Sequence, residues 1–126
     1  MTLYEQLGGA PAVSMALETF YARINSDPQL SPFFASTDFV DLQPKVETFF
    51  AMVAGAPSDY SGPTLRDAHR RFLRAGLNDA IFDRFVTTFE TVLTDLGVPA
   101  GPKAQVMQML WGARDEVLGR PVQAGV

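Results

Sequence analysis

The residue types present in this chain limit the chemistry that it can perform. Its 126 residues include a single histidine, His69, and no cysteine. The absence of thiols excludes disulfides, iron–sulfur clusters, thiolate zinc sites and a cysteine nucleophile. One histidine is also a poor start for a zinc site, and no G-x-S-x-G elbow accompanies it to form a Ser-His-Asp triad. Most catalytic and metal-binding constellations are therefore excluded.

One cofactor, haem, needs only a single ligand from the protein. Its iron takes one neutral imidazole, and the rest of the macrocycle prefers a dry cleft lined by aromatic and aliphatic side chains. The sequence places His69 near Leu65 and Phe72 and contains ten phenylalanines. A single histidine on a helix is more often a surface or capping residue, and phenylalanines at helical spacing more often form an ordinary core. Composition leaves both interpretations open.

Helices must position these residues, because apolar side chains recur at steps of three and four along most of the chain. The length is that of one domain, residues 1–126, and no internal repeat, low-complexity tract or alternating strand pattern is present. The pattern predicts an all-α fold with a frayed tail at 120–126. Long helices are predicted at about 11–24, 39–53, 78–96 and 102–117, short ones at 2–7 and 63–71, and an aromatic corner at 31–34.

Pro44 falls inside the third of these segments, where a proline removes a helical hydrogen bond. Either it kinks the middle of the helix, or Asp41 is the N-cap and Pro44 belongs to the first turn. We expect the second arrangement.

The charge balance argues against a nucleic-acid surface. Ten Lys and Arg residues face 14 Asp and Glu residues, so the net charge is −4. A local cluster of arginines, which we interpret as a solvated helix face, comprises Arg66, Arg70, Arg71 and Arg74. No apolar run approaches the ~20 residues of a membrane span, and the amino terminus lacks the regions of a signal peptide. We expect a cytoplasmic protein that is a monomer or a weak dimer.

The order and spacing of several short motifs resemble those of the truncated haemoglobins, and of the first group of that family best. The similarity covers about residues 2–119. It is carried by LYEQLGG at 3–9, FY at 20–21, DPQL at 27–30, FF at 33–34, DYSG at 59–62, Leu65 and His69, GLND at 76–79, FD at 82–83 and LGVP at 96–99.

This resemblance implies a two-over-two helical sandwich that holds non-covalent haem b and reversibly binds O2, NO and CO. The helix at 42–53 is expected to pair with that at 13–24 over the distal face, and the two C-terminal helices to form the other layer. His69 aligns with the proximal iron ligand. Its second ring nitrogen is expected to donate to a backbone carbonyl one turn earlier, that of Leu65.

The resemblance also assigns residues to the rest of the pocket. Tyr21 aligns with the distal tyrosine, which donates a hydrogen bond to the ligand, and Phe34 with the ring that wedges against the porphyrin. Lys45 aligns with a residue whose ammonium reaches a haem propionate. The remaining pocket-lining residues are expected to be Leu42, Val46, Phe49, Phe50, Leu65, Leu77, Phe82 and Val86.

The distal side departs from the family pattern. Many relatives place a glutamine where Val46 stands here, and Leu42 is apolar too, so Tyr21 is expected to be the only distal donor. A register shift at Pro44 would instead let Gln43 or Thr48 fill the gap. If the helix bends there, the alternative to the propionate contact is coordination of the iron by the neutral amine of Lys45.

Three functions remain in competition. The first is reversible gas binding, in storage or transport of O2 or in NO dioxygenation to nitrate. Such turnover requires an external reductase, because the chain has no flavin or nicotinamide fingerprint. The second is a gas or redox sensor that acts through an external partner. The third is a haemless helical interaction module.

Overall fold

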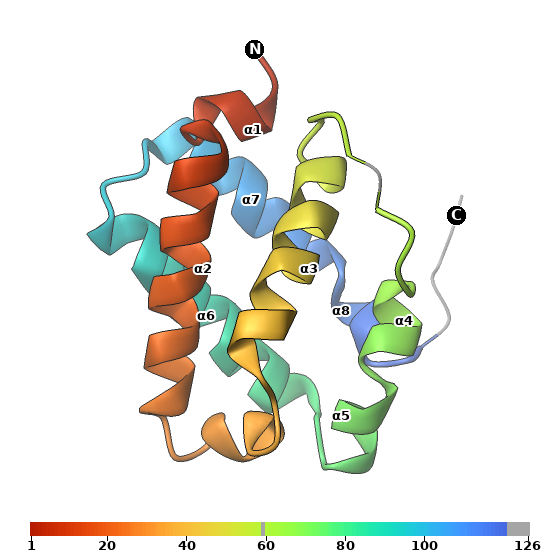
Figure 1. Cartoon of the computed structure of the whole chain (residues 1–126). Coiled ribbons are helices and arrows are strands. Elements are labelled where there is room, and N and C mark those ends of the chain that lie inside the picture. Colours follow the sequence, from red (N-terminus) through yellow and green to blue (C-terminus); the bar gives the residue numbers. More distant parts are fainter. Residues whose placement is uncertain (59, 121–126) are drawn as a thin grey trace.

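α-Helices form the regular structure of the described residues, 1–58 and 60–120, in the computed structural model (Figure 1). The prediction of an all-α fold is confirmed. The helices are α1 (Leu3–Gln6), α2 (Gly9–Asn25), α3 (Phe39–Val53), α4 (Leu65–Ala68), α5 (Arg70–Arg74), α6 (Asp79–Asp95), α7 (Ala100–Gly112) and α8 (Arg114–Val117), with a 3-10 turn, η1, at Ser31–Phe34.

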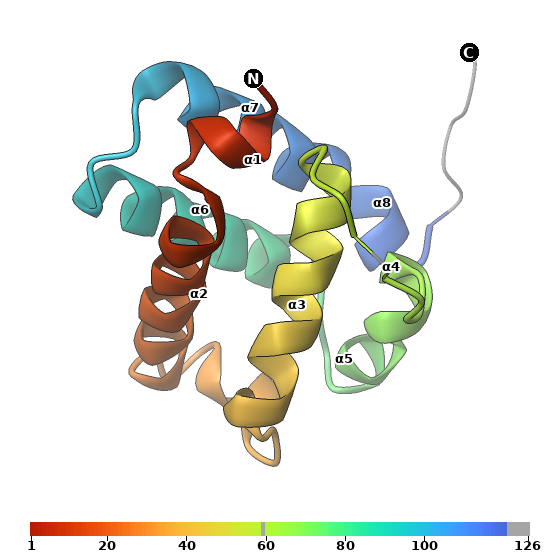
Figure 2. The ribbon, with the colours of Figure 1, turned by 45° about the horizontal axis from the view of Figure 1, so that its top comes forward.

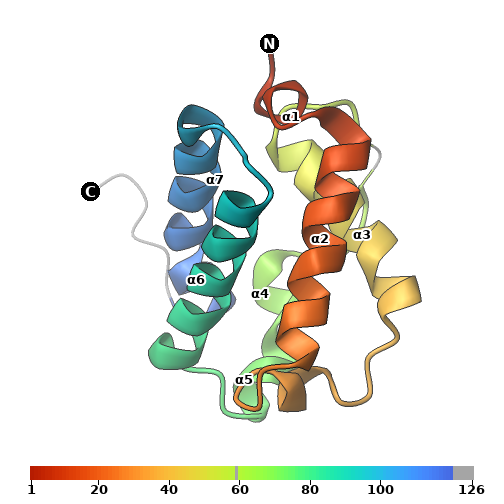
Figure 3. The same ribbon diagram turned by 90° about the vertical axis from the view of Figure 1, so that its left-hand side faces the viewer.

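The long helices form two layers, α2 and α3 against α6 and α7 (Figure 3). The layers meet mainly where α2 packs on α6, because each presents an apolar stripe to the other. One cluster of the core is centred on α6 and α7 and includes Val92 and Val106, which are almost fully buried. A second lies between α2 and α3 and includes Ile24 and Leu30. This arrangement is the two-over-two sandwich that the resemblance implied.

Short-range signals set the start of the chain, as the sequence predicts. The Thr2 side chain accepts a hydrogen bond from the Glu5 amide at 3.1 Å, and the Glu5 carboxylate accepts one from the Thr2 amide at 3.3 Å, which is a capping box. Gly8 then turns the chain into α2 with a φ of +108°, and a Cβ there would lie 2.8 Å from the Cβ of Ala12. Only glycine fits this turn without strain.

The start of α3 differs from the prediction. Asp38, not Asp41, is the N-cap: its backbone is extended, and its Oδ1 accepts from the amides of Val40 at 2.9 Å and Asp41 at 3.4 Å. Pro44 therefore lies inside the helix as its sixth residue. The carbonyl left without an amide partner belongs to Val40, which is 86% exposed, so water can satisfy it. That solvation makes the internal proline tolerable.

The segment predicted as one short helix at 63–71 is two helices that meet at His69. Thr64 caps α4 by accepting from the Asp67 amide at 3.2 Å, and His69 ends α4 with a ψ of 4° before α5 begins. The last predicted helix is likewise divided at Ala113 into α7 and α8. Of the predicted frayed tail, Arg120 is described and pairs with Asp79; residues 121–126 lie outside the described residues.

Candidate functional site

His69 lies between α4 and α5, and its ring faces the backbone of the preceding helical turn. Its Nδ1 lies 2.7 Å from the carbonyl oxygen of Leu65. Because a carbonyl can only accept, Nδ1 carries the hydrogen and Nε2 of the neutral ring keeps its lone pair. The hydrogen bond predicted for this pair is therefore present, and it leaves one ring nitrogen available as a ligand.

The surroundings of His69 favour the neutral ring. Burial lowers the pKa of the imidazole below its usual value near 6.5, and the positive charge of Arg71 acts in the same direction. The Leu65 hydrogen bond and the Glu116 carboxylate oppose this shift without cancelling it. At neutral pH the ring is therefore mostly uncharged, the form that binds a metal ion.

Tyr21 extends from α2 into a set of aromatic rings. Its side chain is buried, and its ring centroid lies 5.0 Å from that of Phe39 and 6.2 Å from that of Phe34. Burial, and then the negative charge of Glu47, raise the pKa of the phenol above its usual value. Tyr21 is therefore a neutral O–H donor at neutral pH.

The Tyr21 hydroxyl forms no hydrogen bond with another residue in the described part of the chain. Within the same residues, no fully enclosed side-chain oxygen or nitrogen lacks a partner. The hydroxyl must therefore border open space. A donor in this position is free to bond with a ligand.

The two polar side chains considered as alternatives to Val46 are engaged elsewhere. Gln43 Nε2 lies 3.3 Å from Ser14 Oγ on α2, and Thr48 Oγ1 donates to the Pro44 carbonyl at 2.9 Å. Val46, by contrast, packs against the cluster that contains Tyr21. The structure thus offers no support for a register shift that replaces Val46 with Gln43 or Thr48.

A row of rings connects the Tyr21 region with His69. The Phe34 ring lies 5.2 Å from that of Phe72, which in turn lies 5.6 Å from the imidazole. Phe72 was expected beside His69, and Phe39, which packs on Tyr21 and Phe34, was not among the predicted site residues. Phe34 therefore lies between the ring of Tyr21 and that of Phe72, which borders His69.

The remaining predicted pocket residues fall into two sets. Five are half-buried and keep apolar surface uncovered: Leu42, Val46, Phe49, Phe50 and Leu65. Three are buried in the α6–α7 core cluster: Leu77, Phe82 and Val86. The Phe82 ring is occupied by Trp111, 6.2 Å away, and by the Arg114 guanidinium, 4.9 Å away. The first set is thus the better placed to contact a cofactor.

Lys45 lies on the exposed side of α3. Its Nζ is 3.0 Å from Asp41 Oδ2, and 68% of its side chain is accessible. The ammonium is therefore engaged one turn back on its own helix, and it is free to change partners.

α3 lies between α2 and the α4–α5 segment, as two views show (Figures 1 and 2). It packs closely on α2, whereas α4 packs on α5 and α8. A pocket of about 260 Å³ between α3 and α4 is lined by Phe49 and Leu65, together with Tyr60 and Glu116. Phe49 of α3 and Leu65 of α4 thus line one pocket.

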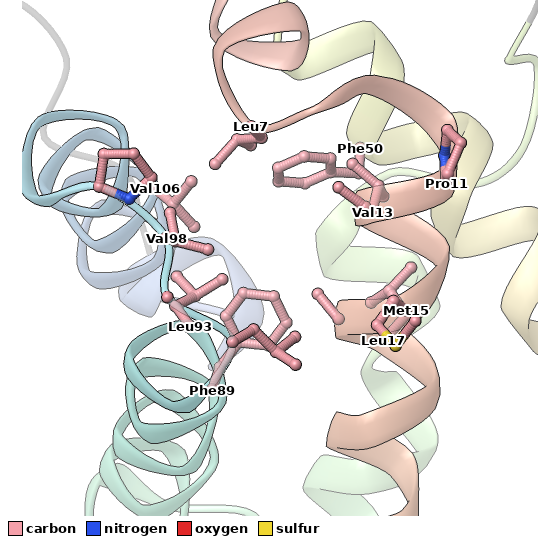
Figure 4. A pocket seen from close by; sticks show the side chains of 15 residues that line it. Leu7, Pro11, Val13, Met15, Leu17, Phe50, Phe89, Leu93, Val98 and Val106 are labelled. Atoms are coloured by element: carbon pink, nitrogen blue, oxygen red, sulfur yellow. The ribbon is translucent and has the colours of Figure 1, made fainter.

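A second, apolar pocket of about 470 Å³ lies between α2 and the α6–α7 layer (Figure 4). Phe50, Phe89 and Leu93 point into it, and Met15 and Leu96 at its rim are partly exposed. Because Phe50 and Phe89 also pack against the cluster around Tyr21, the pocket adjoins the candidate site.

Two general properties of the described residues complete the site. No three of their His, Asp or Glu side chains converge to hold a metal ion. None of their helices combines the length and the apolar character that crossing a membrane requires.

Comparisons with known proteins agree with this geometry. The family model described as bacterial-like globin matches residues 2–118. A group 1 truncated haemoglobin of Chlamydomonas moewusii is 33% identical over 124 residues, which is 98% of this chain and 72% of the relative. One from Synechocystis is 34% identical over 106 residues, 83% of this chain and 86% of the relative.

Solved structures show the same relationship. The 2/2 haemoglobin of Synechococcus, in the cyanomet state with covalently attached haem, superposes with a TM-score of 0.90 at 30% identity, covering 95% of this chain and 100% of that one. The Fe(III) truncated haemoglobin of Tetrahymena pyriformis gives a TM-score of 0.84 at 27% identity, covering 94% and 98%.

Proposed function

Since the chain belongs to the bacterial-like globin family and, within it, to the truncated haemoglobins, we propose that it holds haem b and binds O2 and other diatomic gases reversibly. Haem supplies an iron centre with an open position for a small ligand. The observation that carries the proposal is the pairing of His69 with the Leu65 carbonyl at 2.7 Å, together with the packed rings of Phe72 and Phe34 that connect His69 with Tyr21 and its free hydroxyl.

His69 is the proposed proximal ligand, through Nε2. The hydrogen bond to Leu65 holds the ring in one tautomer and one orientation and makes Nε2 more basic. It is the only histidine in a chain without cysteine, so neither a second imidazole nor a thiolate competes with it for the iron.

Tyr21 is the proposed distal donor. O2 bound to ferrous haem gains partial negative charge and accepts a hydrogen bond strongly, whereas CO polarises less. In a site of low dielectric constant, a phenol donor therefore favours O2 over CO. One such bond is worth about 1–3 kcal/mol, or roughly ten- to a hundredfold in affinity.

The half-buried apolar residues on α3 and α4 keep water out and contact the porphyrin. Phe34 would contact the porphyrin, and Leu42 and Val46, which pack against the cluster of Tyr21, would line the same side of the site as the phenol. Lys45 is the proposed propionate partner, which requires its ammonium to leave Asp41. That exchange costs little, because an exposed pair one helical turn apart is worth only about 0.3–0.5 kcal/mol.

We also propose that the haem is held non-covalently, although one structural relative carries it covalently attached. Without cysteine, no thioether can form, and the only histidine serves as the axial ligand. Extraction of the haem into acidified butanone tests this point: all of the pigment should leave the protein.

NO dioxygenation is the finer form of the proposal. One NO, one O2 and one electron from ferrous iron give one nitrate, and the iron is left ferric. The apolar pocket beside the Tyr21 cluster supports it, because both gases partition into apolar space. Mixing the oxygenated protein with NO in a single turnover should give one nitrate per haem, and a yield near zero would refute this step.

The main proposal is tested by optical spectra of the purified protein in its ferric, ferrous, oxygenated and CO forms. The wild type should show an intense Soret band. His69→Gly should lose haem or its proximal ligation, and added imidazole should restore the wild-type spectrum. A variant that keeps an identical spectrum without imidazole would remove His69 from the iron.

Lys45→Ala serves as the matched control for axial ligation. If Lys45 serves a propionate only, the ferric spectrum should be the same in this variant and in the wild type from pH 6 to pH 10. A wild-type spectrum that changes where that of Lys45→Ala does not would show that the amine coordinates the iron instead.

A further inference from the structure

Positive charge in this acidic chain is concentrated around His69. Residues 64–78 contain four arginines and one aspartate, a formal charge of +3. The rest of the chain contains six cations and thirteen anions, a formal charge of −7. The segment consists of α4, α5 and the adjoining turns, so the cationic pole of the molecule coincides with the element that carries the proposed iron ligand.

The four arginines are not equivalent. Arg70 pairs with Asp67 at 2.8 Å, and Arg66 donates to the Arg120 carbonyl at 2.6 Å. Arg71 and Arg74 are exposed, and neither forms an ion pair with a carboxylate of the described residues. They stand three positions apart on α5 and therefore share one side of that helix. We call this pair the α5 arginine face.

The Phe72 ring lies between the α5 arginine face and His69. The Arg71 guanidinium carbon lies 5.0 Å from the centroid of Phe72, and the Phe72 ring lies 5.6 Å from the imidazole. A continuous packed path thus leads from an exposed cation to the proximal side of the site.

We propose that the α5 arginine face docks a small acidic electron-carrier protein that reduces the ferric form of this chain. This inference rests on the proposed function, in which the iron ends each NO turnover ferric. The carrier loses one electron, the iron gains it, and no atom or proton is transferred. The negative remainder of the surface repels an acidic carrier, so attraction at the +3 pole orients the encounter. Such complexes have small interfaces, and charge governs their association rate.

The test uses a plant-type [2Fe–2S] ferredoxin, whose potential of about −400 mV makes it a suitable donor. Reduced ferredoxin is mixed with the ferric haem-loaded protein, and the second-order rate constant is measured by stopped flow at about 10 mM ionic strength. Arg74→Glu should lower this rate constant by at least about tenfold, and the difference should shrink at about 0.5 M salt.

Lys103→Glu is the matched control, because it makes the same charge change elsewhere. Lys103 Nζ contacts Thr94 Oγ1 at 3.1 Å, at the end of α6 that lies roughly 20 Å from α5. The two regions stand on opposite sides of the molecule in Figure 1. This control should retain the wild-type rate constant within about twofold. The affinity for oxidised ferredoxin, which calorimetric titration measures without turnover, should decrease in Arg74→Glu only.

Equal losses in the two variants would show an effect of net charge and overturn the docking face. An unchanged rate constant in Arg74→Glu would also overturn the docking face. In that case, faster release of haem would identify Arg74 as a propionate partner, and weaker binding to duplex DNA would identify a nucleic-acid contact. A wild type without a Soret band would refute the proposed function itself. A normal Soret band without site dependence would refute the docking face alone.

Discussion

Burial shifts the pKa values of His69 and Tyr21 in opposite directions, and both shifts favour the uncharged side chain. It lowers the pKa of the imidazole and raises that of the phenol, so both groups are held uncharged. Desolvation disfavours whichever form carries charge. The result is a lone pair on Nε2 of His69 and an O–H donor on Tyr21, the two forms that reversible gas binding needs.

The Tyr21 hydroxyl should control how long O2 stays bound. Tyr21→Phe removes the donor and keeps the ring, so we expect the O2 dissociation rate to rise about tenfold or more, and the CO dissociation rate to change by less than about twofold. Stopped-flow ligand replacement measures both rates. Tyr4→Phe, which removes a phenol from α1 beside the same cluster, is the control and should change neither.

Val46 offers the reverse experiment. It packs against the Tyr21 cluster, and Val46→Gln adds a second donor there. A bond worth about 1.4 kcal/mol should slow O2 dissociation about tenfold. Val40→Gln makes the same change at a position of α3 that is 86% exposed, and its rate should match the wild type. Equal rates in the two variants would place Val46 away from the ligand.

At the scale of elements, breaks and caps place the site. The division between α4 and α5 falls at His69, and the η1 turn presents Phe34 to Phe72 at 5.2 Å. α3 carries Leu42 and Val46 at one helical turn from each other, and its start depends on Asp38. Local signals of capping and turn formation thus set where the pocket residues lie along their helices.

The N-cap of α3 should contribute measurably to folding. Asp38→Ala removes the acceptor for the amides of Val40 and Asp41, and we expect the free energy of unfolding in urea to fall by about 1 kcal/mol. Asp41→Ala removes only an exposed pair with Lys45 and should cost about half as much. The opposite order would restore Asp41 as the cap.

Across the whole molecule, ion pairs join the two layers. Arg23 on α2 pairs with Asp95 of α6 at 2.7 Å, and Arg84 of α6 pairs with Asp27, just after α2, at the same distance. The Arg84 hydrogen bond holds the pKa of Asp27 below its usual value near 3.9. The folded protein therefore binds this proton less readily than the unfolded chain does.

This pKa shift predicts a pH dependence of stability. The contribution of Asp27 is present above about pH 4 and is lost as the pH falls through its lowered pKa in the folded state. Asp27→Asn should therefore be less stable than the wild type at pH 6, and the difference should shrink at pH 3, as urea unfolding can measure. Asp67→Asn, which breaks an exposed pair within one segment, should change stability less at pH 6. A difference for Asp27→Asn that does not depend on pH would contradict the role of the carboxylate.

Residue order alone predicted the helices and the aromatic corner at 31–34, because each depends on contacts within a few residues. The resemblance added the bond between His69 and Leu65. Only the tertiary structure decided that Gln43 turns to Ser14 and that Phe72 connects Phe34 with His69. These contacts depend on how one helix lies against another. That geometry comes from packing over the whole core, which no short stretch of sequence contains.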